Sequence, residues 1–183
     1  MATPVADNNA RPQSQTLTVE QQRARLHRAL LAQPHEDRLR KMLMQLCPVD
    51  ALRQAGQRGV FIGYARSDEL FAIDLAADLR TGGVDVWMDM MDISYDEDGD
   101  WGTEIVNALN RCGLMLMVVS EEAQRDRDLQ RERDHFIHNG KIVLPVIYQP
   151  GSYDLRMHLP AIDLRYYERG LQTLTRLFAR KQS

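Results

Sequence analysis

The stretch VFIGYARSDELFAIDLAADLRTGGVDVWMD, residues 60–89, decides the fold class of this chain. It begins with an apolar run over 60–64, continues with a helical pattern over 68–80, and returns to a second apolar run over 84–88. Short apolar runs between helical patterns are typical of strands buried on both faces, as in a parallel sheet. The stretch therefore predicts a strand, a crossover helix and a second parallel strand.

The same alternation continues to the end of the chain. Three helical patterns and three apolar runs follow in turn, covering 102–110, 114–120, 121–139, 142–147, 162–165 and 168–180. Together these segments predict an α/β fold with a five-stranded, parallel, doubly wound sheet in the flavodoxin-like strand order. The connection from 89 to 101 is expected to be a long acidic loop.

The residues before the first strand have a different composition. Residues 1–16 are rich in Pro, Asn, Gln and Ser without periodicity, which predicts a disordered tail. Thr18 followed by Gln21 predicts a capped helix start. We expect 17–58 to be a small helical segment that docks on the main domain or on a partner, and 59–183 to be the α/β domain.

Composition and charge exclude several classes of protein. Of the 183 residues 44% are hydrophobic and 27% charged, and the net charge of −3 divides into +4 for 1–60 and −7 for 61–183. An acidic domain lacks the basic surface that nucleic acids require. No apolar run is long enough to span a bilayer, no signal peptide is recognisable, and the two cysteines lie far apart. We expect a reduced, soluble, cytoplasmic protein without nucleic-acid or membrane partners.

In open α/β sheets, ligands bind beyond the carboxyl ends of the strands. In this chain those ends carry the run Tyr64-Ala65-Arg66-Ser67-Asp68, then Asp89, then Ser120-Glu121. Neither a P-loop nor a dinucleotide-binding glycine pattern follows the first strand, and the acidic residues of a phospho-accepting receiver are missing.

Two acidic features fall short of a metal-binding pattern. Seven Asp and Glu side chains between 85 and 100 do not match the spacing of an EF-hand, so a solvated loop is expected, with a loose cation site or an arginine-rich contact as the alternative. Glu132 and His135 form a single Glu-x-x-His pattern without a second one, so no metal is predicted there.

Ordered blocks of sequence resemble the Toll/interleukin-1 receptor (TIR) domain family, in its bacterial form. The resemblance extends over 60–165, and it rests on the order and spacing of six blocks. They are VFIGYARSDE (60–69), LAADLRTGGVDVWMD (75–89), WGTEIVNALNRC (101–112), LMLMVVSEEA (114–123), GKIVLPVI (140–147) and LPAIDLR (159–165).

The resemblance implies one of two activities. Many TIR domains cleave NAD+ to nicotinamide and ADP-ribose or a cyclic form, and others only assemble signalling complexes through homotypic contacts. Enzymatic members carry a glutamate about eight residues before the Gly-Lys pair that opens the fourth strand, which corresponds here to Glu132. They commonly have Trp four residues earlier, where this chain has Asp128, and Ser where it has Gly63.

One carboxylate suffices for this chemistry. Nicotinamide leaves as a neutral base, so positive charge develops on the ribose and a carboxylate beside it stabilises that charge. NAD+ is then a substrate, and neither a cofactor nor a metal is expected. The expected substrate-binding residues are Tyr64, Ala65, Arg66, Ser67, Trp87, Asp89, Ser120 and Asp128.

Other interpretations stay open at this point. Glu132 is also compatible with an exposed ion pair to Arg125, Arg131 or His135. Trp87 is also compatible with packing alone. The leading hypothesis is a TIR-type NAD+ glycohydrolase gated by self-association, in signalling or defence, and the alternatives are a non-catalytic TIR adaptor and a nucleotide-binding sensor. The helices of 17–58 would bind a protein partner or receive a signal.

Overall fold

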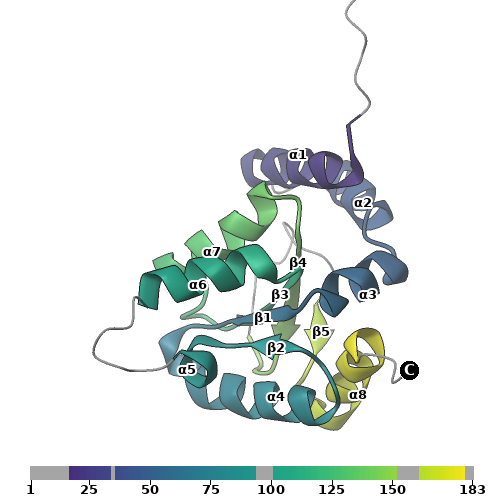
Figure 1. The fold of residues 1–183 in the computed structure, drawn as a ribbon. Coiled ribbons are helices and arrows are strands. Elements are labelled where there is room, and N and C mark those ends of the chain that lie inside the picture. The colour runs from purple at the N-terminus through teal and green to yellow at the C-terminus, as the bar shows by residue number, and fades with distance from the viewer. Residues whose placement is uncertain (1–16, 34–35, 94–100, 152–160, 180–183) are drawn as a thin grey trace, which may run out of the picture.

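The sheet determines the architecture of the molecule (Figure 1). The structure is a computed structural model that describes residues 17–33, 36–93, 101–151 and 161–179. All neighbouring strands are parallel, and their order is β2-β1-β3-β4-β5. The predicted five-stranded, doubly wound sheet is therefore confirmed. The strands are β1 (Val60–Gly63), β2 (Val86–Trp87), β3 (Leu114–Val119), β4 (Ile142–Ile147) and β5 (Ile162–Asp163).

Helices cover both faces of the sheet and divide the core into two layers (Figure 1). Alternate residues of each strand face opposite layers, so that Val60 and Ile62 lie in one layer and Phe61 in the other. The first layer contains α4 and α8, and the second contains α6 and α7. These helices are α4 (Glu69–Thr81), α6 (Trp101–Arg111), α7 (Arg127–His138) and α8 (Tyr167–Phe178).

Two predicted elements are wrong in detail. The helix expected over 121–139 begins only at Arg127, because the carboxylate of Asp126 accepts hydrogen bonds from the backbone N–H groups of residues 128 and 129 and caps the helix there. The connection expected to be a loop from 89 begins with a short helix, α5 (Asp89–Asp92). The acidic residues of 94–100 and the predicted tail of 1–16 lie outside the described residues.

Three helices precede the sheet and contribute to its first core layer. Thr18 caps α1 in a reciprocal capping box with Gln21, as predicted. Side chains from all three helices belong to the same buried cluster as the strands, among them Leu30 and Leu43. The helices are α1 (Val19–Ala32), α2 (Asp37–Gln45) and α3 (Val49–Gln57).

Close backbone contacts join these helices to the α/β part. The buried guanidinium of Arg23 donates hydrogen bonds to the carbonyl oxygens of Gly140 at 2.9 Å and Leu46 at 3.3 Å. Gly56 of α3 lies against the ring of Phe178 on α8, and a Cβ at Gly56 would come within 2.3 Å of it. The N-terminal helices therefore lie directly against the sheet and its covering helices.

Candidate functional site

Glu132 lies on α7 and points toward the carboxyl end of β1. A Cβ placed on Gly63, the last residue of that strand, would lie 3.6 Å from Oε2 of Glu132. The Glu132 side chain is half-buried, and none of the described residues forms a hydrogen bond or an ion pair with it. The helical pattern places it beside the buried Leu129 and Phe136, which anchor α7 to the sheet.

The surroundings of Glu132 disfavour its ionised form. Burial, followed by the negative charges of Asp89, Asp126 and Asp128, raises the pKa of Glu132 to about 8. A half-buried carboxyl group without hydrogen-bond donors loses its proton at a higher pH than an exposed one, because its charged form is poorly stabilised. Many catalytic acids have a raised pKa for the same reason.

The residues considered as exposed partners of Glu132 have other contacts. Arg131 forms an ion pair with Asp128 at 2.8 Å, Arg125 lies 3.9 Å from Glu121, and His135 lies 3.2 Å from the side chain of Asn110. Glu132 is thus left facing the sheet.

Tyr64 and Asp89 bring the loops after β1 and β2 together. The Tyr64 hydroxyl donates a hydrogen bond to Oδ1 of Asp89 at 2.5 Å, and the same oxygen accepts one from the backbone N–H of Met90 at 2.8 Å. Burial and the neighbouring Asp89 raise the pKa of the Tyr64 hydroxyl well above its usual range, so it stays a donor. The charge of Asp89 also acts on Glu132, which faces Gly63, the residue directly before Tyr64.

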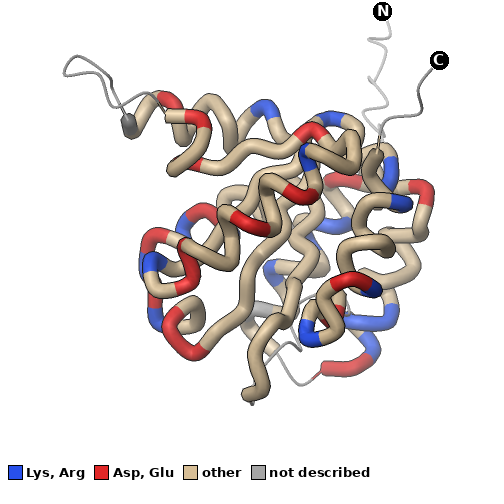
Figure 2. The backbone as a smooth tube through the Cα atoms, turned by 90° about the horizontal axis from the view of Figure 1, so that it is seen from below, with Lys and Arg blue, Asp and Glu red and all other residues tan. Residues whose placement is uncertain are grey.

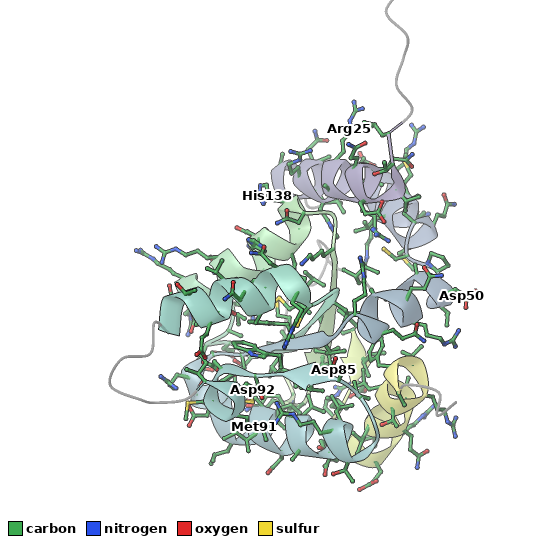
Figure 3. All side chains as sticks on the ribbon, viewed as in Figure 1. Arg25, Asp50, Asp85, Met91, Asp92 and His138 are labelled. Carbon is green, nitrogen blue, oxygen red and sulfur yellow. The ribbon has the colours of Figure 1, made fainter. Side chains whose placement is uncertain are left out.

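A second pair of residues holds α5 in place, and no sequence pattern signals it. Oδ2 of Asp92 accepts hydrogen bonds from Arg80 at 2.5 Å and from the backbone N–H of Met88 at 2.7 Å. Arg80 also donates to the carbonyl oxygen of Val86 at 3.1 Å. Figure 3 shows Met91 and Asp92 on this short helix, beside α4. The contacts fix the position from which Asp89 reaches Tyr64.

A buried network at the carboxyl ends of β3 and β4 is likewise absent from the sequence-based expectations. Asp68 is buried, and its carboxylate accepts hydrogen bonds from Ser120 at 2.6 Å and from Tyr148 at 2.7 Å. Ser120 in turn accepts a hydrogen bond from the backbone N–H of Ala123 at 3.0 Å. The ring of Tyr148 stacks on Phe71 with 3.9 Å between centroids. This network fixes the loop after β1, and the Ser120 hydroxyl is fully engaged in it.

The remaining predicted binding residues are divided between surface and core. Arg66 and Ser67 lie exposed on a single 3-10 turn, and Arg66 donates a hydrogen bond to Glu69 at 2.8 Å. Ala65 is buried just before that turn. Trp87 is a core residue stacked on Phe61, with 5.0 Å between their ring centroids.

Asp128 lies in the first turn of α7, with 85% of its side chain exposed and paired with Arg131. The structure therefore joins Tyr64 to Asp89 beside the end of β1 that Glu132 faces, and leaves Arg66 and Ser67 exposed further along the same loop. Ser120 and Trp87 serve the surrounding fold, and Asp128 lies on the surface of α7. Within the described ranges no helix is long and apolar enough to span a bilayer, and no three acidic, His or Cys side chains cluster as a metal site.

Comparison with known proteins identifies the family. The family model for the TIR domain matches residues 60–175, which is more than half of the chain. Among solved structures, the TIR domain of the Toll-related receptor TRR-2 from Hydra magnipapillata is similar in fold, with 21% sequence identity and a TM-score of 0.51. That match covers 64% of this chain and 97% of the Hydra chain. No curated protein matches. The chain belongs to the TIR domain family.

Proposed function

We propose that this TIR domain is an NAD+ glycohydrolase in which Glu132 is the catalytic carboxylate. The observation that carries the proposal is a half-buried Glu132, without a partner among the described residues, at the carboxyl end of β1, the edge where open α/β sheets bind ligands. The reaction releases nicotinamide and either ADP-ribose or a cyclic ADP-ribose, with NAD+ as substrate and no cofactor.

The electrostatics of the site favour a cationic ligand. Burial, together with the negative charges of Asp89, Asp126 and Asp128, raises the pKa of the Glu132 carboxyl. The pyridinium ring of NAD+ would bring a positive charge to the same place and return Glu132 to its ionised form. The attraction between the bound cation and the carboxylate would then offset the free energy that opposes ionisation of Glu132 in the free protein.

The reaction needs one bond to break and one to form. The bond between C1′ of the ribose and the ring nitrogen breaks, and both electrons go to the nitrogen, which becomes neutral. The carboxylate of Glu132 stabilises the positive charge left on the ribose. A water oxygen then bonds to C1′ and releases a proton, or an adenine nitrogen closes the cyclic product. Tyr64 and Asp89 would orient the substrate.

Arg66 is the group that we assign to the diphosphate of NAD+. It is exposed, it lies on the loop after β1, and its partner Glu69 is exposed enough to release it. An anion that approaches this loop competes with one surface ion pair, which is worth about 0–1 kcal/mol. Ser67, on the same turn, adds a hydroxyl.

A non-catalytic TIR adaptor is the second candidate, and one observation favours it. Where enzymatic TIR domains commonly have Trp, this chain has Asp128, and its carboxylate lies exposed and paired with Arg131. No aromatic side chain thus covers the substrate from that position. An adaptor would act through homotypic contacts between TIR domains in signalling or defence. A domain that only senses a nucleotide would also leave NAD+ intact.

The deciding experiment measures NAD+ cleavage by the purified full chain over a wide range of protein concentration. We expect the specific rate to rise with concentration, since the proposed activity is gated by self-association. Glu132→Ala should lower the rate by at least about 10²-fold, as removal of one transition-state-stabilising group does. Glu121→Ala is the matched control, because Glu121 is exposed and its carboxylate forms a loose surface ion pair with Arg125 at 3.9 Å.

Two outcomes would contradict the proposal. Cleavage by Glu132→Ala close to that of the unaltered protein would place the catalytic carboxylate elsewhere. Absence of cleavage even when the protein is forced to self-associate would favour the adaptor. Melting temperatures of both variants verify that they are folded.

A further inference from the structure

Helices α1 and α2 leave an apolar groove between them. The groove has a volume of about 520 Å³, and most of its lining is apolar. Leu17 and Met42 in this lining are among the exposed large hydrophobic residues, with 39% and 43% of their surface accessible. We call it the α1–α2 groove, and its apolar lining consists of Leu17, Leu26, Ala29, Leu39, Met42 and Leu46.

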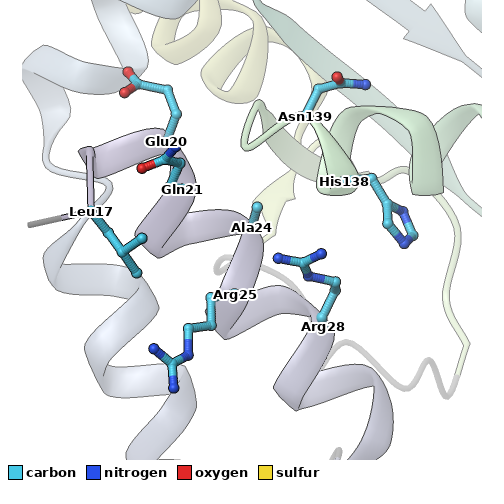
Figure 4. A pocket seen from close by; sticks show the side chains of 8 residues that line it. All are labelled: Leu17, Glu20, Gln21, Ala24, Arg25, Arg28, His138 and Asn139. Atoms are coloured by element: carbon cyan, nitrogen blue, oxygen red, sulfur yellow. The ribbon is translucent and has the colours of Figure 1, made fainter. Parts of the chain in front are cut away.

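Unpaired basic side chains surround this groove. Arg25 lines it, Arg28 lies one turn further along α1, and Arg38 and Lys41 lie next to Met42 on α2. Among the described residues, the side chains of these four form no hydrogen bond or ion pair. Arg25 and Arg28 both project from α1 (Figure 4), and Arg25 lies on the outer side of the molecule (Figure 3).

The opposite end of the molecule presents a face of complementary chemistry. Leu70 on α4 is 78% exposed, more than any other large hydrophobic residue of the described chain. Along the same side of α4, Asp74, Ala77 and Asp78 are exposed as well. We call these four residues the Leu70 face. Figure 1 shows α4 and α1 at opposite ends of the molecule, and Figure 2 is a view from the α4 end with acidic residues in red.

We propose that the α1–α2 groove binds the Leu70 face of a second copy of this chain. Leu70 of the second copy would enter the apolar lining, and Asp74 would meet the basic side chains of Arg25 and Arg38. Asp78, whose Oδ2 already accepts a hydrogen bond from the Tyr167 hydroxyl at 2.7 Å, would add negative charge beside them. The net charges of +4 for 1–60 and −7 for 61–183 would favour the same head-to-tail approach. This proposal names the surfaces through which the chain would self-associate. It rests on the self-association assumed in the proposed function and does not depend on NAD+ cleavage.

The placement of the two surfaces determines the kind of assembly. Because they lie at opposite ends, a copy cannot fill its own groove. Each docked copy presents a further free groove and a further free Leu70 face, so the contact does not close on itself and adds copies in series. A two-fold dimer would instead bury the same surface on both copies.

Sedimentation velocity of the full chain tests the inference without reference to catalysis. We expect the sedimentation coefficient to rise with protein concentration in about 0.1 M salt, where charges interact over about 10 Å. In about 1 M salt this range shortens to about 3 Å, and the association should weaken. Arg25→Glu in the groove and Asp74→Arg on α4 should each abolish the rise. Arg125→Glu and Val106→Arg are the matched controls, since both positions are exposed and lie outside the two surfaces.

Mixing the variants distinguishes a head-to-tail contact from a two-fold one. Arg25→Glu retains an intact Leu70 face, and Asp74→Arg retains an intact groove, so an equimolar mixture should form a complex of two chains that does not grow. Formation of this complex also shows that both variants are folded. The double variant with both changes should regain some association with itself, because the charges are exchanged.

Three results of the association experiments would overturn the inference. Loss of association in the controls to the same extent, or no complex in the mixture, would exclude this pair of surfaces. No concentration-dependent association of the unaltered chain would exclude a second copy as the occupant and indicate an acidic helix of another protein instead. NAD+ cleavage in the same samples is read separately, so that a failure of one proposal is not taken for a failure of the other.

Discussion

The hydroxyl of Tyr64 and the carboxylate of Asp89 are joined by a hydrogen bond of 2.5 Å that ties the loop after β1 to helix α5. Tyr64→Phe removes the donor and leaves the half-buried Asp89 with fewer partners. We expect the free energy of unfolding to fall by about 1 kcal/mol and amide exchange in α5 to become faster. Urea denaturation and hydrogen exchange measure these effects. Tyr166→Phe, at a position 72% exposed, is the control, and an equal loss there would contradict the role of the bond.

Cleavage of NAD+ should depend on pH through Glu132. The ionised carboxylate is the active form, and the pKa of Glu132 is raised to about 8 in the free protein, so kcat/KM should increase with pH and level off above about 8. Asp89→Asn removes one negative neighbour and should move the midpoint to lower pH. A profile that falls with pH, or a midpoint that Asp89→Asn leaves in place, would contradict this assignment. Initial rates at low NAD+ concentration give the profile.

The ionisation of Glu132 should also affect stability, but with the opposite dependence on pH. Glu132 has a folded-state pKa of about 8, above the ordinary 4.5, so the native state holds a proton that the unfolded state has lost over that range. The free energy of unfolding therefore decreases as pH rises from about 4.5 to about 8. Glu132→Gln should be more stable than the unaltered protein at about pH 9 and nearly equal to it at about pH 5. The gain should be about 1.4 kcal/mol for every pH unit that separates the folded-state pKa from the unfolded-state pKa.

The exposed Glu122 provides the control for this measurement, made by urea denaturation at several pH values. Glu122→Gln should leave the pH dependence unchanged. If Glu132→Gln has no more effect than Glu122→Gln, the site does not oppose ionisation of Glu132.

Gly63 lies where two core side chains leave no room for a Cβ atom. A Cβ at this position would lie 2.1 Å from Cε of Met115 and 2.8 Å from Cδ1 of Leu129. Gly63→Ser should lower the free energy of unfolding by about 1–3 kcal/mol, as overpacking does. In a Met115→Ala background the same change should be less destabilising, because the space has been opened. A double-mutant cycle by denaturation checks this, and additive effects of the two changes would refute it.

His27 should make the protein sensitive to acid. It is 2% exposed, and neither ring nitrogen has a partner among the described residues. Burial and the nearby Arg23 lower the pKa of His27 to about 4, below the ordinary 6.5. The unfolded state thus binds a proton that the native state does not, and stability is lost as pH falls from about 6.5 to about 4. His27→Leu should remove this loss, whereas His138→Leu, at an exposed position, should not. Thermal melts of both variants and of the unaltered protein from about pH 4 to about pH 8 test this, because His27 titrates within this range in the folded and unfolded states.

The sheet was predictable because its signal is local. Continuous apolar runs such as 114–119 and 142–147 lie between helical patterns, and this arrangement is typical of strands buried on both faces. The same topology places the residues after each strand at one edge, which is why Tyr64 and Asp89 could be expected to lie near each other, and the structure joins them by a hydrogen bond. In contrast, the helical pattern of 121–139 did not reveal that Asp126 caps α7 several residues later than expected.

The missed parts of the site depend on contacts between distant residues. Asp68 and Tyr148 are 80 positions apart, and no pattern in the sequence relates them. Arg80 and Asp92 belong to different elements, and their pairing depends on how α5 lies beside α4. The position of Glu132 on α7, beside the apolar stripe, was readable from periodicity. Its lack of a partner was not, because it depends on Arg131 and Arg125 pairing with other carboxylates.

The contact of Arg23 with the Gly140 carbonyl has a practical consequence for anyone who wishes to isolate this domain. The recognisable family pattern starts at residue 60, yet the buried core extends upstream of it, since α1 lies on the turn after α7 and α3 covers Phe178. A truncation that respects the sequence boundary would strip apolar surface from the first core layer and leave the helix that carries Glu132 without its neighbour at one end. The excised fragment should therefore refold poorly, and any activity assay performed on it would report damage to the scaffold.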